Sequence, residues 1–296
     1  MKSTAPLSMV SAVHLKKSDA RLMRRKATDR LIASLVTAAA GLAVAMLIII
    51  LGYIVVKGLP ALTPAFFTQR PLPTGEAGGG VWPAIAGTMT MLAVASVIGI
   101  PLGIGTGIYL AENYGGRFGS AVRFSVDLIA GLPSIVVGVF IWAIVVRHVV
   151  GQYNALAGAL ALAIIMVPIL TRTVEEVLRI VPDTLREASL ALGIPRWKTT
   201  LRVIMPTARA GIVTGALLSV ARAGGETAPL LLTALGNQFF SINLFQPMAS
   251  LPVQIYTYAI SPYDDWHTKA WGAALVLIMV VALLNLLTRA AISRLH

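Results

Sequence analysis

Cysteine is absent from all 296 residues of the chain. Without thiols the chain can form no disulfide, and it offers neither a thiolate metal ligand nor a cysteine nucleophile. Histidine is scarce as well, because the 4 histidines are scattered and no His-Glu-x-x-His pattern occurs. We therefore expect no metal site and no cofactor.

The sequence also lacks the short motifs of common enzymes. It has no Gly-x-x-x-x-Gly-Lys-Ser/Thr loop to cradle a nucleotide phosphate, and no Gly-x-Ser-x-Gly elbow to present a serine nucleophile. We find no candidate catalytic residue and expect a protein that is not an enzyme. If ATP drives its function, a partner must hydrolyse that ATP.

Charged residues are few, at 12% of the chain, whereas soluble domains have about 25%. Hydrophobic residues make up 57%, and the mean hydropathy is +0.81. These values predict an all-α, polytopic membrane protein. The net charge of +12 does not indicate nucleic-acid binding, because the charges lie at the ends of apolar runs and no basic face is interleaved with aromatic residues.

Six apolar runs are long enough, or nearly so, to cross a hydrocarbon core that needs about 20 helical residues. We predict a Gly- and Pro-rich irregular loop at 57–82, a short polar loop at 111–123 and a longer connection at 236–270. The six predicted transmembrane helices are 31–56, 84–110, 124–146, 155–170, 208–235 and 271–287.

Lysine and arginine are distributed very unequally between the two sides of these spans. One side carries 19 of them and the other carries 4, which predicts that both termini are cytoplasmic. The first apolar run is long enough to remain as an uncleaved anchor. We divide the chain into a basic cytoplasmic tail (1–30), a first helix with an external loop (31–82), a core of five helices (83–290) and a cytoplasmic C-terminus (291–296).

A polar interruption separates the fourth and fifth apolar runs, and we call residues 183–206 the polar loop. Thr184 and Glu187 have capping-box spacing, which predicts a helix start. Gly193 suits a left-handed helix end, and Pro195 then opens a second short helix that ends near Pro206. We expect two short helices that form a rigid unit on the cytoplasmic side.

The polar loop resembles the EAA loop of ABC importer permeases at Glu187, Ala188, Gly193 and Pro206. It departs from that pattern at three positions, which are Ser189, Val203 and Met205. The resemblance implies that these residues form the coupling helix that a separate ATPase subunit grips. The alternative is a cytoplasmic helical hairpin of some other membrane protein.

Arg222 lies in the middle of the fifth apolar run, where a cation costs about 2.5–3.5 kcal/mol on insertion scales. Glu226 follows on the same helix face, and Gly224, Gly225 and Pro229 predict a helix break near 224–228. Arg222 either faces a translocation path and meets an anion, or forms a buried pair with Glu226 that fixes packing. A third possibility combines these, with Glu226 neutralising Arg222 until an anion replaces it.

A second charged cluster lies at the cytoplasmic end of the fourth run. Spacings of three and four place Arg172 and Arg179 each beside both Glu175 and Glu176. The cluster is either an ion-pair face that anchors the helix end, or an exit gate or a link to the fifth span. Asp127 could pair with Arg123, four residues before it, in a structural role.

Four further stretches resemble the PstA-type permease subunits of high-affinity phosphate ABC importers. The resemblance extends over nearly the whole chain from about residue 30 and is weakest at 57–80. It implies the six-helix fold of type I (MetI-like) importer permeases in the bacterial inner membrane. The matching stretches are 101–112 (PLGIGTGIYLAE), 132–140 (LPSIVVGVF), 222–239 with its Arg-x-x-Gly-Glu-Thr-Ala-Pro start, and 246–252 (QPMASLP).

The resemblance also implies partners and a mechanism. Members of the family pair with a homologous second permease subunit, sit on two ATPase subunits, receive phosphate from a periplasmic binding protein, and contact a signalling regulator and a sensor kinase. They import phosphate by alternating access. The resemblance implies that Arg222 and Glu226 lie in the substrate path. It also suggests Arg172 and Glu175 as candidates for path or gating residues. Two alternatives remain: a permease for sulfate or phosphonate, and an ATP-independent secondary transporter or channel.

Overall fold

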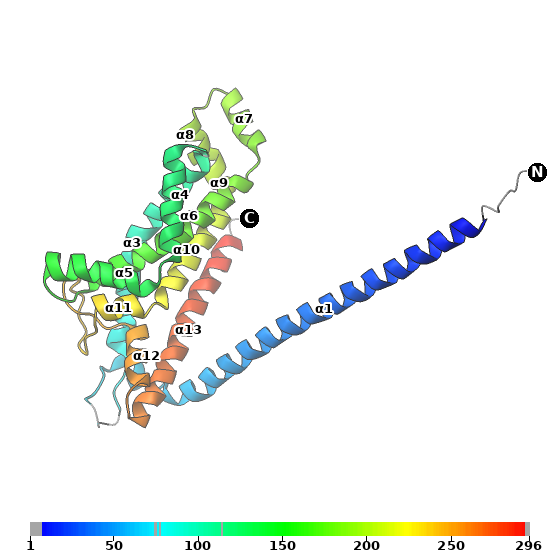
Figure 1. Cartoon of the computed structure of the whole chain (residues 1–296). Helices are drawn as coiled ribbons and strands as arrows, with labels where there is room; N and C mark the ends of the chain where they lie inside the picture. The colour runs from blue at the N-terminus through cyan, green and yellow to red at the C-terminus, as the bar shows by residue number, and fades with distance from the viewer. Residues whose placement is uncertain (1–7, 74–75, 77, 114, 294–296) are drawn as a thin grey trace, which may run out of the picture. The chain divides into compact units, whose positions relative to one another are not determined.

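The computed structural model describes residues 8–73, 76, 78–113 and 115–293. Its regular structure is helical, and no β-strand occurs within these residues. The chain divides into two compact units, Met1–Tyr53 and Ile54–His296, and each is described by itself. Figure 1 follows the helices in chain order. The predicted C-terminal segment 291–296 lies partly outside the described residues.

The first unit consists of most of helix α1 (Ser8–Gly58). The prediction that a helix covers 31–56 is confirmed, but the helix also extends backward as far as Ser8, within the basic tail. At about 1.5 Å per residue, its 51 residues exceed the roughly 30 Å of a hydrocarbon core. The basic tail is therefore largely a helical extension of the first span.

The second unit contains all the remaining elements. The loop at 57–82, predicted to be irregular, includes two short helices, because Pro60 and Pro64 each lie in a first helical turn. The elements are η1 (Leu59–Ala61), α2 (Pro64–Thr68), α3 (Trp82–Glu112), α4 (Arg117–Gly131), α5 (Ser134–Ile141), the π-helix η2 (Trp142–Val150), α6 (Ala155–Ile180), α7 (Asp183–Ala191), α8 (Arg196–Thr199), the π-helix η3 (Thr200–Ile204), α9 (Met205–Thr207), α10 (Arg209–Gly224), α11 (Ala228–Thr233), α12 (Leu251–Ala259) and α13 (Asp264–Ser293).

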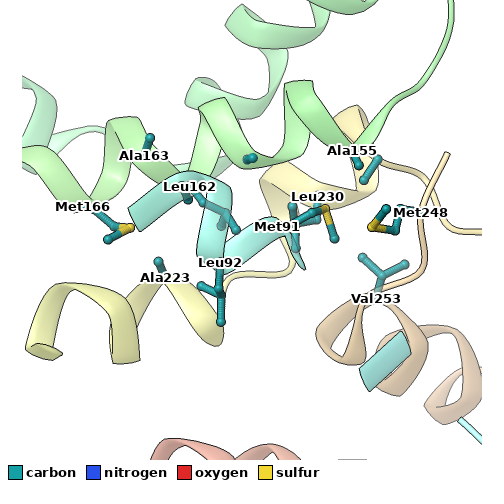
Figure 2. Close-up of a cluster of buried hydrophobic side chains, with 13 residues drawn as sticks. Met91, Leu92, Ala155, Leu162, Ala163, Met166, Ala223, Leu230, Met248 and Val253 are labelled. Carbon is teal, nitrogen blue, oxygen red and sulfur yellow. The ribbon is translucent and has the colours of Figure 1, made fainter. Parts of the chain in front are cut away.

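Helix α6 is the centre of this unit. It packs along α3 and also contacts α4 and α10, and α10 in turn contacts α13. Figure 1 shows α7 and α8 at one end of these helices and α12 near the other. Figure 2 shows a cluster of buried apolar side chains where α3, α6, α10, α11 and α12 meet, among them Met91, Leu162, Met166 and Leu230.

Glycines allow α3 to approach α6 closely. Gly99, Gly103 and Gly107 recur every four residues and face α6. A β-carbon at Gly107 would lie 2.6 Å from Cβ of Val174 and 2.8 Å from the carbonyl oxygen of Thr171. Small residues at such spacing are the usual means by which membrane helices pack backbone to backbone.

We predict opposite effects for alanine at two glycines of α3. Gly107→Ala is expected to lower the free energy of unfolding by about 1–3 kcal/mol, because the methyl group overpacks the α3–α6 contact. Gly105→Ala is the matched control, since no atom lies within 4 Å of its β-carbon. It should be neutral or stabilise by up to about 1 kcal/mol through helix propensity. Thermal unfolding in detergent measures both, and equal losses would contradict the packing argument.

The third predicted span, 124–146, is not one continuous helix. Helices α4 and α5 are separated at Leu132 and Pro133, and the two halves are bent by 102°. Leu132 has an extended ψ of 138°, because the residue before a proline avoids the helical region. Helix α4 also begins at Arg117, so the polar loop predicted at 111–123 is shorter than expected.

The fifth predicted span, 208–235, ends early. Helix α10 stops at Gly224, and the separate helix α11 begins at Ala228, which confirms the predicted break. The segment Arg196–Thr207 is bent by 76° from α10. Within the described residues, four helices are long and apolar enough to cross a membrane, or up to six if each bent pair is one span.

Candidate functional site

Arg222 lies in the last turn of α10, directly before the helix break. Its neighbour Ala223 is buried in the cluster of Figure 2, whereas the Arg222 side chain is 64% exposed and so faces away from that core. The Nη2 atom of Arg222 lies 4.0 Å from Oε1 of Glu226, too far for a hydrogen bond, and the Glu226 side chain is 15% exposed. This geometry does not support a tight buried pair.

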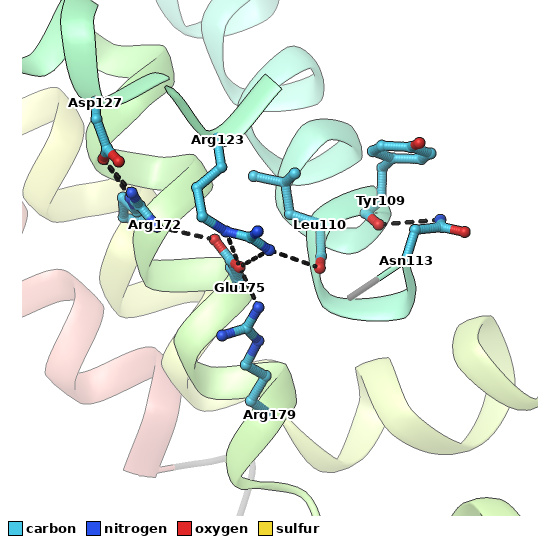
Figure 3. A network of polar contacts seen from close by, with 8 residues as sticks. All are labelled: Tyr109, Leu110, Asn113, Arg123, Asp127, Arg172, Glu175 and Arg179. Carbon is cyan, nitrogen blue, oxygen red and sulfur yellow. Dashed lines mark hydrogen bonds and ion pairs between the residues drawn. The ribbon is translucent and has the colours of Figure 1, made fainter. Parts of the chain in front are cut away.

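Glu175 is the most buried carboxylate of the described side chains, at 2% exposure, and three arginines converge on it (Figure 3). Arg123 of α4 donates from Nε at 3.0 Å and from Nη2 at 2.7 Å to Oε1. Arg179 donates to the same oxygen at 2.5 Å, and Arg172 donates to Oε2 at 3.3 Å. A buried carboxylate requires such pairing, because desolvation of a lone charge is costly.

Asp127 of α4 pairs with Arg172, and this contact is the second ionic link between α4 and α6. The predicted pair Arg123–Asp127 is therefore wrong, since both residues use partners on α6 instead. Arg123 also donates to the carbonyl oxygen of Leu110 at the end of α3. The cluster thus joins three helices and, with three arginines and two carboxylates, holds one net positive charge.

These contacts also show where Glu176 lies and whether the four candidates for the substrate path contact one another. Glu176 is exposed and takes no part in the cluster as the structure describes it, so pairing of Arg172 and Arg179 with Glu176 was wrong. Within the described part of the chain, no hydrogen bond or ion pair joins Arg222 or Glu226 to Arg172 or Glu175. The four path candidates therefore form two separate groups.

The polar loop has the two-armed form that its sequence predicts, with one correction. Helix α7 begins at Asp183 after Pro182, so Thr184 lies inside the helix and forms no capping box with Glu187. Proline at the N-cap, with ψ of 138°, starts the helix before Thr184 can cap it. Gly193 has φ of +76°, as predicted, and its N–H bonds to the Leu190 carbonyl at 2.9 Å.

The polar loop exposes several residues, and some of them are large and apolar. Glu187, Ala188 and Pro206 are exposed, together with Leu192 at 80% and Trp197 at 60% exposure. The base of the loop is buried in an apolar cluster that joins it to α6 through Leu170, Val174, Leu178 and Ile204. Large exposed apolar groups on a firmly seated helical loop are typical of a protein-binding surface.

Sequence reasoning missed three contacts of this region. Arg123 bonds to Glu175, Arg186 of α7 pairs with Glu112 of α3, and the hydroxyls of Ser189 and Thr199 lie 2.8 Å apart. The first two partners are 52 and 74 residues apart, so local spacing carried no signal for them. The sequence did single out Ser189, because this position departs from the EAA pattern. The described residues contain no group of three His, Cys, Asp or Glu side chains that could hold a metal ion.

These features define a helical, multi-pass membrane protein with a charged cluster between its helices and, at one end, a helical loop that exposes large apolar side chains. Residues 99–296 match the family model described as binding-protein-dependent transport system inner membrane component, and the chain belongs to that family. Transport permeases of this family are not themselves enzymes.

Phosphate transport system permease proteins are among the relatives of this chain. The chain is 45% identical over 268 residues to the PstA protein of Yersinia pestis, covering 90% of each chain. It is 47% identical over 240 residues to PstA of Xylella fastidiosa strain 9a5c, covering 80% of this chain and 83% of the relative. PstA 1 of Mycobacterium tuberculosis strain H37Rv is 46% identical over 209 residues, covering 70% and 68%.

Solved structures support the fold. The inward-facing MetNI methionine ABC transporter aligns with a TM-score of 0.62 and 20% identity over 73% of this chain and 97% of that chain. A bacterial ABC transporter that imports alginate aligns with a TM-score of 0.57 and 14% identity over 91% and 99%. The predicted MetI-like permease fold is confirmed.

Proposed function

We propose that this chain is a transmembrane subunit of an ATP-driven importer of inorganic phosphate. The observation that carries the proposal is the similarity to PstA over nine tenths of the chain. We further propose that a homologous second permease subunit, two ATPase subunits and a periplasmic phosphate-binding protein complete the importer. A signalling regulator and a sensor kinase are proposed as additional partners.

Arg222 is proposed to meet phosphate in the path between the two permease subunits. Its exposure on the isolated chain supports this role, because a cation in mid-span must be covered by protein or by a water-filled path and not by lipid. A guanidinium also fits an oxyanion with two parallel hydrogen bonds. One or two cations attract the anion without trapping it, which transport requires.

The polar loop is proposed to receive the movement of an ATPase subunit through Glu187, Ala188, Gly193 and Pro206. ATP binding would close the ATPase pair, move both polar loops and open the path outward. Hydrolysis would then reopen it inward. Phosphate shifts this equilibrium only as far as it binds one state better than the other. In the same mechanism Arg172 and Glu175 would act on the inner side, as gating groups.

Substrate identity is tested by uptake into vesicles that hold the complete importer. Labelled phosphate should enter in an ATP-dependent manner, and a large excess of unlabelled sulfate or phosphonate should leave its rate unchanged. Competition by either anion would instead indicate a permease for a wider class of oxyanions. Because Arg222 by itself attracts any oxyanion, this competition distinguishes the two possibilities.

The topology, with both termini in the cytoplasm, gives a prediction that the cysteine-free chain makes simple to test. A cysteine introduced at the exposed Glu76 should react with a membrane-impermeant thiol reagent in spheroplasts. A cysteine at the exposed Asp183 should react only after the membrane is opened. The reverse pattern would invert the proposed topology and place the polar loop out of reach of ATP.

A further inference from the structure

The first arm of the polar loop, helix α7, is attached to the membrane helices differently from the second arm. Ile204, in the second arm, is fully buried in the apolar cluster with Leu178 and Val174 of α6. A cavity of about 540 Å³ separates α7 from the ends of α3 and α6, and residues of α8 and η3 in the second arm also line it. Apolar packing therefore seats the second arm, and α7 needs another form of attachment.

Arg186 reaches across this cavity from α7. Its guanidinium pairs with Glu112 at the C-terminal end of α3 and donates from Nη2 to the Leu178 carbonyl of α6 at 3.2 Å. Nε also lies 3.6 Å from Asp183, whose side chain is 88% exposed. One side chain thus bonds to both helices that form the tightest pair in the unit, with α3 and α6 joined through their glycine contacts.

The covalent connection alone does not fix the direction of α7. Only Val181 and Pro182 separate α6 from α7, and both have extended backbone angles, with ψ of 124° and 138°. The hydroxyl contact between Ser189 and Thr199 ties α7 to α8, so this contact links α7 to the membrane helices only through the second arm. Without Arg186, α7 would lose the side-chain bonds that join it directly to α3 and α6.

We propose that Arg186 is a positioning residue that transmits movement of α7 to α3 and α6 through Glu112 and Leu178. The proposal rests on the proposed function, since it specifies how a push on the polar loop reaches the spans. Glu187, the next residue in the chain, lines the same cavity. Its placement therefore depends on the same attachment.

The test compares two carboxylates that contact the same arginine. Glu112→Gln removes the partner on α3, whereas the control Asp183→Asn removes a partner on α7 itself that cannot join helices. In the complete importer in proteoliposomes, Glu112→Gln and Arg186→Gln should each lower the phosphate imported per ATP hydrolysed by about three- to tenfold. Asp183→Asn should change this ratio by less than about twofold, within the scatter of surface substitutions.

A charge exchange separates transmission from simple folding damage. The double variant Glu112→Arg with Arg186→Glu should import more phosphate per ATP hydrolysed than either single variant, because the ion pair re-forms with its charges exchanged. The proposal is wrong if the double variant imports no more phosphate per ATP than the single variants. It is also wrong if Asp183→Asn lowers this ratio as much as Glu112→Gln does.

A measurement without phosphate keeps this outcome separate from failure of the proposed function. In the cysteine-free chain, nitroxide labels at Leu192, beyond α7, and at Leu102 of α3 report the distance between the two elements. Both side chains are exposed. Glu112→Gln should broaden this distance distribution and Asp183→Asn should not. An unchanged distribution would overturn the role of Arg186 even in a working importer, whereas absent phosphate uptake by the unmodified importer would overturn the proposed function alone.

Discussion

Replacing Arg222 by glutamine is expected to slow phosphate uptake by more than about tenfold while the importer still assembles. The Arg222 side chain is largely exposed, and its 4.0 Å contact with Glu226 is too long for a hydrogen bond, so we expect the chain to fold without this guanidinium. An anion that loses a charge-assisted hydrogen bond of about 1.5–3 kcal/mol should pass more than about tenfold more slowly. Labelled phosphate uptake and co-purification of the subunits measure the two outcomes.

The control for Arg222 is another exposed arginine outside the proposed path. Arg117→Gln, at the start of α4, removes the same charge and should leave uptake unchanged. Glu226→Gln separates the remaining possibilities, because a path in which Glu226 neutralises Arg222 predicts altered uptake for it too. If Arg222→Gln instead prevents assembly, the arginine is structural and the phosphate path must be sought elsewhere.

Replacing Glu175 by glutamine is expected to have the largest effect on stability. Three guanidinium groups converge on this carboxylate, and only Asp127 would remain to balance them. Breaking a buried pair by removing one partner costs about 3–5 kcal/mol, since it leaves uncompensated charge. The free energy of unfolding in detergent should fall by that amount, and α4 should separate from α6.

Glu176→Gln is the matched control for Glu175, because the two residues are adjacent on α6 and have the same chemistry. Glu176 is exposed and lies outside the cluster, so its substitution should change the free energy of unfolding by less than about 0.5 kcal/mol. Equal stability of the two variants would mean that the cluster contributes nothing to holding α4 against α6. It would also leave Glu175 free to act only in gating.

The parts of the fold that depend on local chemistry could be predicted from the sequence. Gly224, Gly225 and Pro229 predicted the end of α10, and Gly193 predicted the left-handed turn of the polar loop. Both follow from the backbone limits of glycine and proline, which act within a few residues. The bend at Pro133 was missed because hydropathy continues through it, although the proline was visible.

The partners of the charged side chains could not be predicted in the same way. Arg123 and Asp127 have helical spacing, yet each bonds across to α6. Sequence spacing indicates only which side chains are neighbours on the same helix, whereas bonds between helices depend on how those helices pack. The assignment of Arg172 to a cluster with Glu175 was right, whereas Arg186 gave no signal because its partner lies on α3. The roles of these residues in transport remain predictions.

The most direct test of the central claim is ATP-driven uptake of labelled phosphate by vesicles that contain both permease subunits and the binding protein, with and without the ATPase subunits. The sequence lacks a nucleotide-binding motif, and large apolar side chains of the polar loop are exposed. We therefore predict uptake only when the ATPase subunits and ATP are present. Equal uptake without the ATPase would contradict coupling through the polar loop and would identify the protein as a transporter that works without ATP.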